Sequence, residues 1–248
     1  MPLTTSPLTM RNRDFLTRIA QSGKSILTLN RDREYTALKR MLDLKVTDTV
    51  LDVGCGDGFW TSRLAQNGGR VVGLEPDLKT LGYAQRFHSL PNITYVCGVA
   101  ESLPFRDGAF DKVLSVSCLE HFADPWRGIA EIARVLRPGG RIALSVDSLL
   151  PENSPQTFRE WHRQRHFVTH YFSQETLTKA LQTAGLKYET DSVVHLFRSR
   201  IAAGLRQLFI RRPRLWLSFF PAFYVSVRLS DRMFNDMHGQ IIVVTASR

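Results

Sequence analysis

Cysteine is scarce in this chain of 248 residues, which contains only Cys55, Cys97 and Cys118. An odd number of cysteines at wide spacings predicts neither a disulfide framework nor a metal-binding pair, and it is typical of a reducing compartment. No stretch reaches the roughly 20 apolar residues that span a bilayer. The N-terminal residues also lack the apolar run of a secretory signal. These absences predict a cytoplasmic protein.

Acidic residues are absent from residues 192–230, and most of the chain's formal net charge of +10 resides there. The arginines of this stretch are Arg198, Arg200, Arg206, Arg211, Arg212, Arg214 and Arg228. They flank an aromatic-rich apolar run, Leu215–Val227, that Pro221 interrupts. Basic edges beside an apolar face are typical of an element in a membrane interface. We therefore expect residues 198–229 to contact an anionic membrane surface, at the inner face of a membrane, or to roof a pocket. A packed cap or a dimer surface is the alternative.

Short apolar runs alternate with stretches of helical spacing along most of the chain, which indicates βαβ units and a parallel sheet. The predicted strands are 49–53, 70–74, 93–97, 110–117, 141–146, 187–197 and 240–246. The predicted helices are one or two within 9–44, then 59–65, 77–90, 125–137 and 173–185, with Ser173 as an N-cap and Gly185 as a stop. The pattern predicts a Rossmann-like α/β fold. Its sheet is mostly parallel and seven-stranded, with helices on both faces, an antiparallel last strand and a helical cap insertion.

Three segments follow from this pattern. Residues 1–44 form an N-terminal helical segment, and residues 45–148 form the nucleotide-binding core. Residues 149–248 complete the same domain with elements on the acceptor side, including a basic aromatic insertion at 198–238.

The motif VLDVGCGDG, residues 50–58, carries the strongest chemical signal. Gly54, Gly56 and Gly58 allow the backbone to turn tightly and to approach a ligand, and the following helix N-terminus can face an anionic group. Glu75 stands seventeen residues after Gly58, at the end of the second predicted strand. An acidic residue at about this spacing accepts hydrogen bonds from ribose hydroxyls in such folds. A plain tight turn and a solvated turn residue are the alternatives.

The order of VLDVGCGDG, GLEPD, GVAESLPFRDGAFDKVLSVSCLEHF and RVLRPGGRIALS resembles the class I S-adenosylmethionine-dependent methyltransferases, in the branch that acts on small molecules and lipids. The resemblance covers residues 48–147 and implies S-adenosylmethionine as the cofactor. It assigns the methionine part to the glycine loop (Asp52, Gly54, Cys55, Gly56 and Gly58), and the ribose to Glu75 with Pro76. It assigns the adenine to Ala100 and Glu101. The family often has Asp where this chain has Val99.

Ser117-Cys118-Leu119-Glu120-His121 ends the fourth predicted strand, where open α/β sheets bind ligands. The run resembles Glu-x-x-Glu-His of the ubiquinone-biosynthesis O-methyltransferases, with Ser117 in place of the first Glu. No metal site is therefore predicted. Ser117 is a candidate for cofactor contact, and Glu120 and His121 are candidates for deprotonating an acceptor hydroxyl. The alternative is that His121 only packs at the mouth of the site.

The expected reaction is methyl transfer to a hydroxyl oxygen of a hydrophobic small molecule or lipid. Two alternatives remain at this stage: an RNA (tRNA) methyltransferase, supported by the basic segment, and a non-catalytic cofactor-binding or membrane-associated protein. His162, His166 and His170 follow the core. We expect a solvated basic helix there, with lining of the acceptor pocket as the alternative. The sequence does not indicate an oligomeric state.

Overall fold

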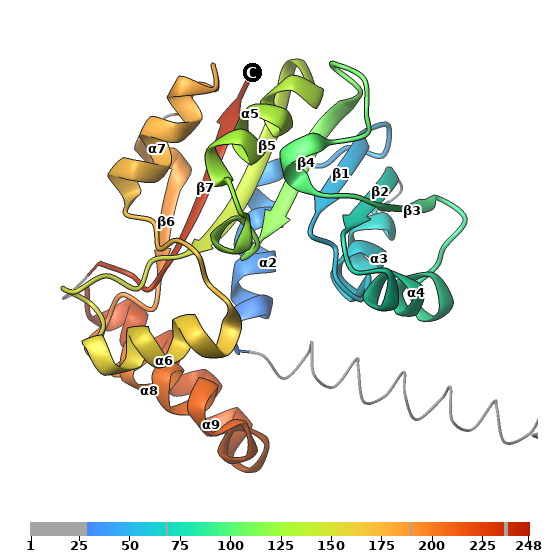
Figure 1. Ribbon diagram of the computed structural model, residues 1–248. Coiled ribbons are helices and arrows are strands. Elements are labelled where there is room, and N and C mark those ends of the chain that lie inside the picture. The colour runs from blue at the N-terminus through green and yellow to red at the C-terminus, as the bar shows by residue number, and fades with distance from the viewer. Residues whose placement is uncertain (1–28, 68, 189, 236–237) are drawn as a thin grey trace, which may run out of the picture.

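The fold is a seven-stranded sheet with helices on both faces, as the alternation predicts (Figure 1). The computed structural model describes residues 29–248 apart from 68, 189 and 236–237. The strands are β1 (Thr49–Val53), β2 (Arg70–Glu75), β3 (Ile93–Cys97), β4 (Phe110–Val116), β5 (Leu136–Asp147), β6 (Val193–Leu196) and β7 (Ile241–Ser247). The helices are α2 (Leu29–Leu42), α3 (Phe59–Ala65), α4 (Leu78–Phe87), α5 (Pro125–Val135), α6 (Gln156–His166), α7 (Gln174–Thr183), α8 (Arg200–Arg211) and α9 (Pro213–Met233). Any helix before residue 29 lies outside the described residues.

The strand order is β3-β2-β1-β4-β5-β7-β6, and β7 alone runs antiparallel to its neighbours. This confirms the predicted mostly parallel sheet with a reversed last strand. Strands β1 and β4 are parallel neighbours, but the order in which successive strands are added across the sheet reverses between them. From β1 the chain goes outward to β2 and β3, and β4 begins the other half. Ligands of open α/β sheets bind at the carboxyl ends of the strands beside such a reversal.

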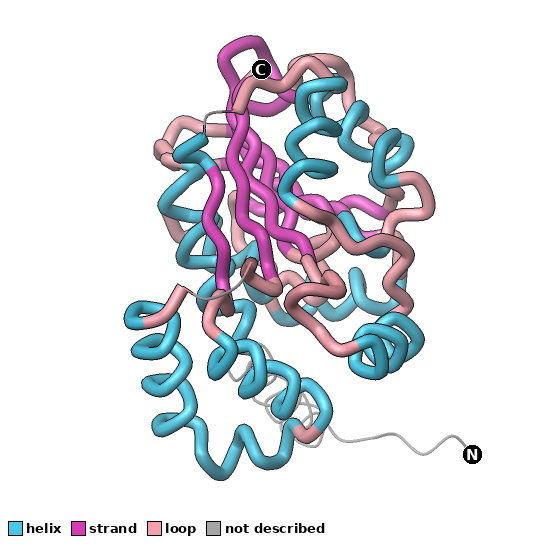
Figure 2. The backbone as a smooth tube through the Cα atoms, turned by 90° about the vertical axis from the view of Figure 1, so that its left-hand side faces the viewer, coloured by secondary structure: helices cyan, strands magenta, loops and turns pink. Residues whose placement is uncertain are grey.

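Two apolar cores cover the two faces of the sheet, because side chains alternate along each strand. In β4, Val113 belongs to the core under α5 and α7, and Leu114 belongs to the core under α2 and α3. Figure 2 shows the strands between these two layers of helices.

Polar caps begin several helices where the sequence provides them. Asp77 accepts a hydrogen bond from the Thr80 amide, and Asp124 accepts one from the Arg127 amide. Ser173 and Thr176 form a capping box at the start of α7, which confirms the predicted N-cap.

Two predicted strands have boundaries that were wrong by several residues, whereas the other strands agree within one residue. Strand β5 begins at Leu136, because Pro138–Gly140 lie in an irregular part of the strand and not in a turn before it. The predicted strand 187–197 is shorter, because a 3-10 turn, η3 (Thr190–Ser192), precedes β6. Lys187 is joined to Ser247 by an isolated bridge only.

Helices α6, α8 and α9 lie together beyond the carboxyl ends of the parallel strands (Figure 1). The same three helices appear below the strands in the turned view (Figure 2). We call them the cap. The predicted insertion at 198–238 therefore forms two helices over the sheet edge that carries the candidate site.

Candidate functional site

The glycine loop connects β1 to α3 and has positive φ at Gly54, Gly56 and Gly58. The amides of Gly54 and Cys55 donate to the Leu74 carbonyl at 2.8 and 3.0 Å, which ties the loop to β2. A Cβ at Gly54 would collide with Cys118 Sγ, whereas a Cβ at Gly56 would meet nothing within 4 Å. The loop is therefore packed on one side and open at Gly56, where a ligand could approach the backbone.

Glu75 joins the end of β2 to this loop. Its carboxylate accepts hydrogen bonds from the amides of Gly56, at 3.1 Å, and Asp77, at 3.2 Å, one on each oxygen. A carboxylate oxygen can accept two hydrogen bonds, so Glu75 keeps capacity for the two ribose hydroxyls that the sequence assigns to it. Pro76 follows it and is exposed.

Asp52 is buried at the carboxyl end of β1 and accepts a hydrogen bond from the Thr61 hydroxyl at 2.6 Å. Burial raises the pKa of Asp52 to about 6 against the lowering effects of Thr61 and Arg31. The carboxyl therefore changes charge just below neutral pH, and a cation bound beside it would favour its ionised form.

The adenine-side residues lie in and before the 3-10 turn η1 (Ala100–Ser102) that follows β3. Val99 is 48% exposed and Ala100 is buried. Glu101 Oε1 accepts the amides of Ala123 and Asp124 at 2.8 and 3.3 Å, so its carboxylate also holds the start of α5. These residues lie at the same sheet edge as Glu75, and their contact with adenine stays a prediction.

The end of β4 approaches the glycine loop through Cys118, which abuts Gly54. Ser117, at φ 41°, donates its hydroxyl to Glu34 Oε2 at 2.5 Å. In the following turn η2 (Leu119–His121) the two predicted catalytic side chains diverge. Glu120 is fully buried, whereas His121 is exposed, with Nδ1 at 3.4 Å from the Phe167 carbonyl oxygen.

Beyond β4 and β5 lies a buried charge cluster from five separate parts of the chain. Its members are Glu34, Glu120, Asp147, His162 and Arg206.

Asp147, at the end of β5, is central to this cluster. Its Oδ1 lies 2.5 Å from the Arg206 guanidinium, and its Oδ2 lies 3.5 Å from His162 Nε2. Its amide donates to Glu120 Oε1 at 3.2 Å. Burial acts to raise the pKa of Asp147, but the electrostatic interactions with Arg206, His162 and Arg31, together with the Arg206 hydrogen bond, outweigh burial and the pKa is lowered. Asp147 is therefore ionised in the folded protein.

The pKa values of the remaining titratable members shift in two directions, upward for the two glutamates and downward for the histidine. Burial, together with the charge of Asp147, raises the pKa of Glu120 well above its usual range. Burial also raises the pKa of Glu34 and lowers that of His162 to about 4. The cluster thus holds the ionised carboxylate of Asp147 beside Arg206. Burial favours the protonated carboxyl of Glu120 and of Glu34, and His162 is neutral at neutral pH.

Sequence reasoning missed most of this cluster. Glu34 lies in a helical stretch and Arg206 was counted among surface arginines, so neither carries a local signal of burial. Asp147 could have been found, because it ends an apolar strand as Glu75 does. The solvated basic helix expected around His162, His166 and His170 is correct for His166, which is exposed on α6. It is wrong for His162, which faces inward onto Asp147, and for His170, which lies after the helix.

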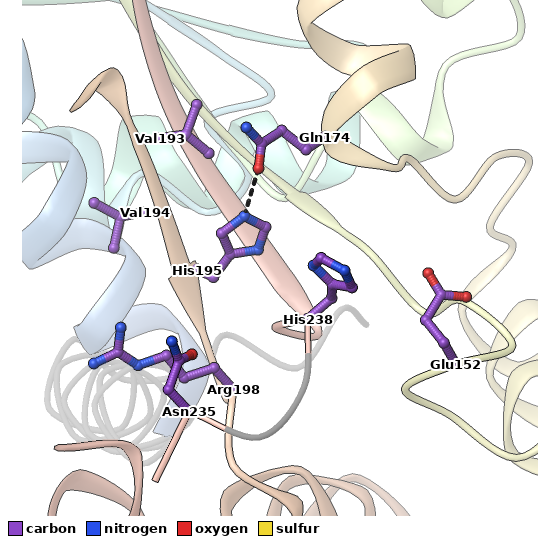
Figure 3. Close-up of a pocket in the computed structure, with 8 residues that line it drawn as sticks. All are labelled: Glu152, Gln174, Val193, Val194, His195, Arg198, Asn235 and His238. Carbon is purple, nitrogen blue, oxygen red and sulfur yellow. Dashed lines mark hydrogen bonds between the residues drawn. The ribbon is translucent and has the colours of Figure 1, made fainter. Parts of the chain in front are cut away.

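A pocket of about 700 Å³ opens at the β6 edge of the sheet (Figure 3). His195 in its wall contacts Gln174 Oε1 through Nε2 at 2.8 Å. Strands β4, β5 and β7 separate this edge from β1, so the pocket is not part of the glycine-loop site. Among the described residues, no group of three or more His, Cys, Asp or Glu side chains could hold a metal ion.

Known proteins match both the sequence and the fold. The family model of the methyltransferase domain matches residues 51–144. The biotin biosynthesis bifunctional protein BioHC of Cellvibrio japonicus is 31% identical over 198 residues, which cover 74% of this chain and 38% of that protein. An uncharacterized methyltransferase of Mycolicibacterium gilvum is 44% identical over 159 residues, covering 64% of this chain and 59% of that protein. The matched region is thus less than two thirds of either relative.

The fold matches a solved structure of phosphoethanolamine N-methyltransferase 2 from Haemonchus contortus in complex with S-adenosyl-L-methionine. The TM-score is 0.65 at 22% identity, over 88% of this chain and 52% of that one. A cofactor at this edge of the sheet fits three features of the structure. These are the glycines with positive φ, the acidic residue at the end of β2 and the strand order. Residues 51–144 therefore match the methyltransferase domain, and the fold around them is that of solved S-adenosylmethionine-dependent methyltransferases.

Proposed function

We propose that the protein transfers a methyl group from S-adenosylmethionine to a hydroxyl oxygen of a hydrophobic small molecule or lipid, with His121 as the base. The observation that carries this proposal is the position of His121. Its exposed imidazole follows Cys118 by three residues, and Cys118 abuts Gly54 of the glycine loop. The turn that carries His121 thus begins next to the loop assigned to the cofactor, which supports His121 as the proton acceptor.

S-adenosylmethionine supplies a methyl group on a positively charged sulfur, so the chain needs to position the acceptor and remove one proton. The hydroxyl would give its proton to His121 as the oxygen–carbon bond forms and the methyl–sulfur bond breaks, with S-adenosylhomocysteine as the leaving group. Positioning of this kind contributes on the order of 7–11 kcal/mol to catalysis. A positioned base contributes about 10²–10⁴-fold in rate.

Glu120 serves the site differently in this proposal. Its raised pKa favours the protonated carboxyl, which cannot accept a proton. Its carbonyl accepts the amides of Thr169 and His170 at 2.8 and 3.3 Å. Glu120 therefore holds η2, and with it His121, against the segment after α6.

The thiols near the loop do not favour a covalent route. Burial raises the pKa of Cys55 and of Cys118 far above the range in which a thiolate forms. Direct transfer from cofactor to acceptor is the simpler mechanism for this site.

The test is methyl transfer from labelled S-adenosylmethionine to panels of quinols, lipid hydroxyls, amines and RNA. We expect transfer to an apolar hydroxyl compound and a fall of about 100-fold in turnover for His121→Ala. The affinity of that variant for S-adenosylhomocysteine should not change. His166→Ala, an exposed histidine on α6, is the matched control.

Unchanged turnover in His121→Ala would remove this residue from the mechanism. Transfer to RNA alone would favour the nucleic-acid alternative. Absence of transfer to every acceptor by a sample that binds the cofactor would favour a non-catalytic protein.

A further inference from the structure

The outward faces of α8 and α9 are unusually apolar. Seven of the thirteen large apolar side chains that are exposed in the described part of the chain occur between residues 201 and 234, so exposure is concentrated there. They are Ile201, Leu208, Phe219, Val225, Leu229, Met233 and Phe234.

On α9 these side chains form a stripe beside a basic stripe. Val225, Leu229 and Met233 are spaced four residues apart and are 52, 52 and 70% exposed. Residues with this spacing share one face of a helix. Arg228 and Arg232 have the same spacing and are also exposed, so they form the adjoining stripe.

No carboxylate reaches this surface from either helix. The sequence of α8 contains no acidic residue, and the only one in α9 is Asp231, which is buried. Asp231 lies 2.6 Å from the Arg33 guanidinium and accepts the amides of Phe197 and Ser199. The positive charge of the outward face is therefore not neutralised within the hairpin.

The inner faces are held firmly, so the apolar stripe cannot turn inward at low cost. Phe209 of α8 and Phe223 of α9 pack edge to face, with ring centroids 4.3 Å apart. Val227 is fully buried, and Tyr224 donates its hydroxyl to Asp32 of α2 at 2.9 Å. The stripe of Val225, Leu229 and Met233 therefore stays on the outside of the molecule.

We propose that the α8–α9 hairpin docks on an anionic bilayer surface. The aliphatic stripe would insert at the boundary between headgroups and acyl chains, and the arginines would contact lipid phosphates. No helix among the described residues is long and apolar enough to cross a bilayer, so the docking is interfacial. Five of the seven exposed apolar side chains are not aromatic and cannot stack on bases, and this disfavours a single-stranded nucleic acid as the occupant.

The hairpin belongs to the cap, which lies beyond the carboxyl ends of the strands (Figure 1). Docking would bring the sheet edge that carries the glycine loop toward the membrane. If the proposed function holds, a lipid-soluble acceptor would reach the site from the bilayer. The docking itself needs neither cofactor nor methyl transfer, so it is tested without them.

The experiment is sedimentation of the full chain with vesicles of phosphatidylcholine alone, or with about one third phosphatidylglycerol. We expect binding to the anionic vesicles at about 0.1 M salt, and weaker binding at about 0.5 M because salt screens the arginines. Arg228→Glu/Arg232→Glu should weaken binding at least about 25-fold, at about fivefold for each arginine lost. Leu229→Glu should weaken it about tenfold or more.

Matched controls lie on other surfaces. Lys79→Glu/Arg127→Glu changes the net charge equally, and Leu78→Glu places the same charge at an exposed leucine on α4. Both should keep most of the binding. Val225→Ser/Leu229→Ser is a milder second variant in case Leu229→Glu does not fold, and thermal melting checks each protein.

Several results would overturn the proposal. One is no binding to anionic vesicles at low salt, and another is an equal loss in the matched controls. A dimer seen by light scattering that Leu229→Glu dissociates, without vesicle binding, would assign the face to a second copy of the chain. Binding of RNA in place of vesicles would assign it to nucleic acid.

Discussion

The two halves of the candidate site are built in different ways. The cofactor half is local: Asp52 and Thr61 are nine residues apart, and Gly56 and Glu75 are nineteen apart. The other half, which we call the cap half, is the buried charge cluster with its neighbour Ser117. It joins distant parts of the chain. Arg206 contacts Asp147 across 59 residues, and Ser117 contacts Glu34 across 83.

The two halves also differ in the interactions that build them. The cofactor half uses the backbone conformation of the glycine loop and its main-chain amides, together with the carboxyl groups of Asp52 and Glu75. The cap half uses buried charges, which are costly unless they are paired. We infer that changes in the cofactor half should mainly affect ligand binding, and that changes in the cap half should mainly affect stability.

The largest expected effect follows from removing the ion pair between Arg206 of α8 and Asp147 of β5. Arg206→Met leaves Asp147 buried without its guanidinium partner and should lower the free energy of unfolding by about 3–5 kcal/mol. Asp147→Asn/Arg206→Met should recover part of this loss, because no uncompensated charge remains. Chemical denaturation measures both.

Arg232→Met on the exposed face of α9 is the control and should cost less than about 0.5 kcal/mol. The affinity of Arg206→Met for S-adenosylhomocysteine should stay within about threefold when the protein is folded. A strong loss of affinity would show that the two halves are not separable.

The next effect concerns the glycine loop. Gly54→Ala places a Cβ against Cys118 Sγ at a positive φ, so the loop must shift or strain. We expect cofactor affinity to fall at least about 100-fold and stability by only about 1–3 kcal/mol. Calorimetric titration and thermal melting measure the two.

Gly82→Ala in α4 is the matched control, since a Cβ there meets nothing within 4 Å. It should leave affinity unchanged and stabilise the helix by up to about 1 kcal/mol. Wild-type affinity in Gly54→Ala would contradict the assignment of the loop.

A smaller effect is expected from the charge of Asp52. If the cationic cofactor favours the ionised carboxyl, the affinity for S-adenosylmethionine should rise as pH passes through the Asp52 pKa of about 6. We expect this affinity to be about tenfold weaker near pH 5 than near pH 8. Asp52→Asn should remove this dependence. Thr61→Val should move its midpoint to higher pH, because the Thr61 hydroxyl lowers the pKa.

The same shift has a consequence for the free protein. The pKa of Asp52 is higher in the folded than in the unfolded chain, so the folded state binds the proton more tightly. Stability from this group is therefore present at low pH and is lost as pH rises from about 4 to about 6. The free energy of unfolding of the wild type, measured relative to that of Asp52→Asn, should fall over this pH range. A difference that stays constant would contradict the raised pKa of Asp52.

The contrast between the halves also explains what the sequence could predict. Strands β1 and β3 have the predicted bounds, and the glycines of the loop form a tight turn as expected, with positive φ, because both depend on a few neighbouring residues. The pairing of Arg206 with Asp147 depends on how α8 folds back over β5, which no local pattern encodes. An arginine in a basic segment therefore gave no sign of its burial, and the inward turn of His162 could not be distinguished from a solvated helix face.

Binding of S-adenosylhomocysteine to the purified full chain, followed by calorimetry with NADH as the comparison ligand, is the most direct measurement. The open face at Gly56, the Glu75 carboxylate and the methyltransferase domain predict micromolar binding of S-adenosylhomocysteine and none of NADH. A folded sample that binds NADH, or that binds neither ligand, would contradict the assignment of this sheet edge to S-adenosylmethionine.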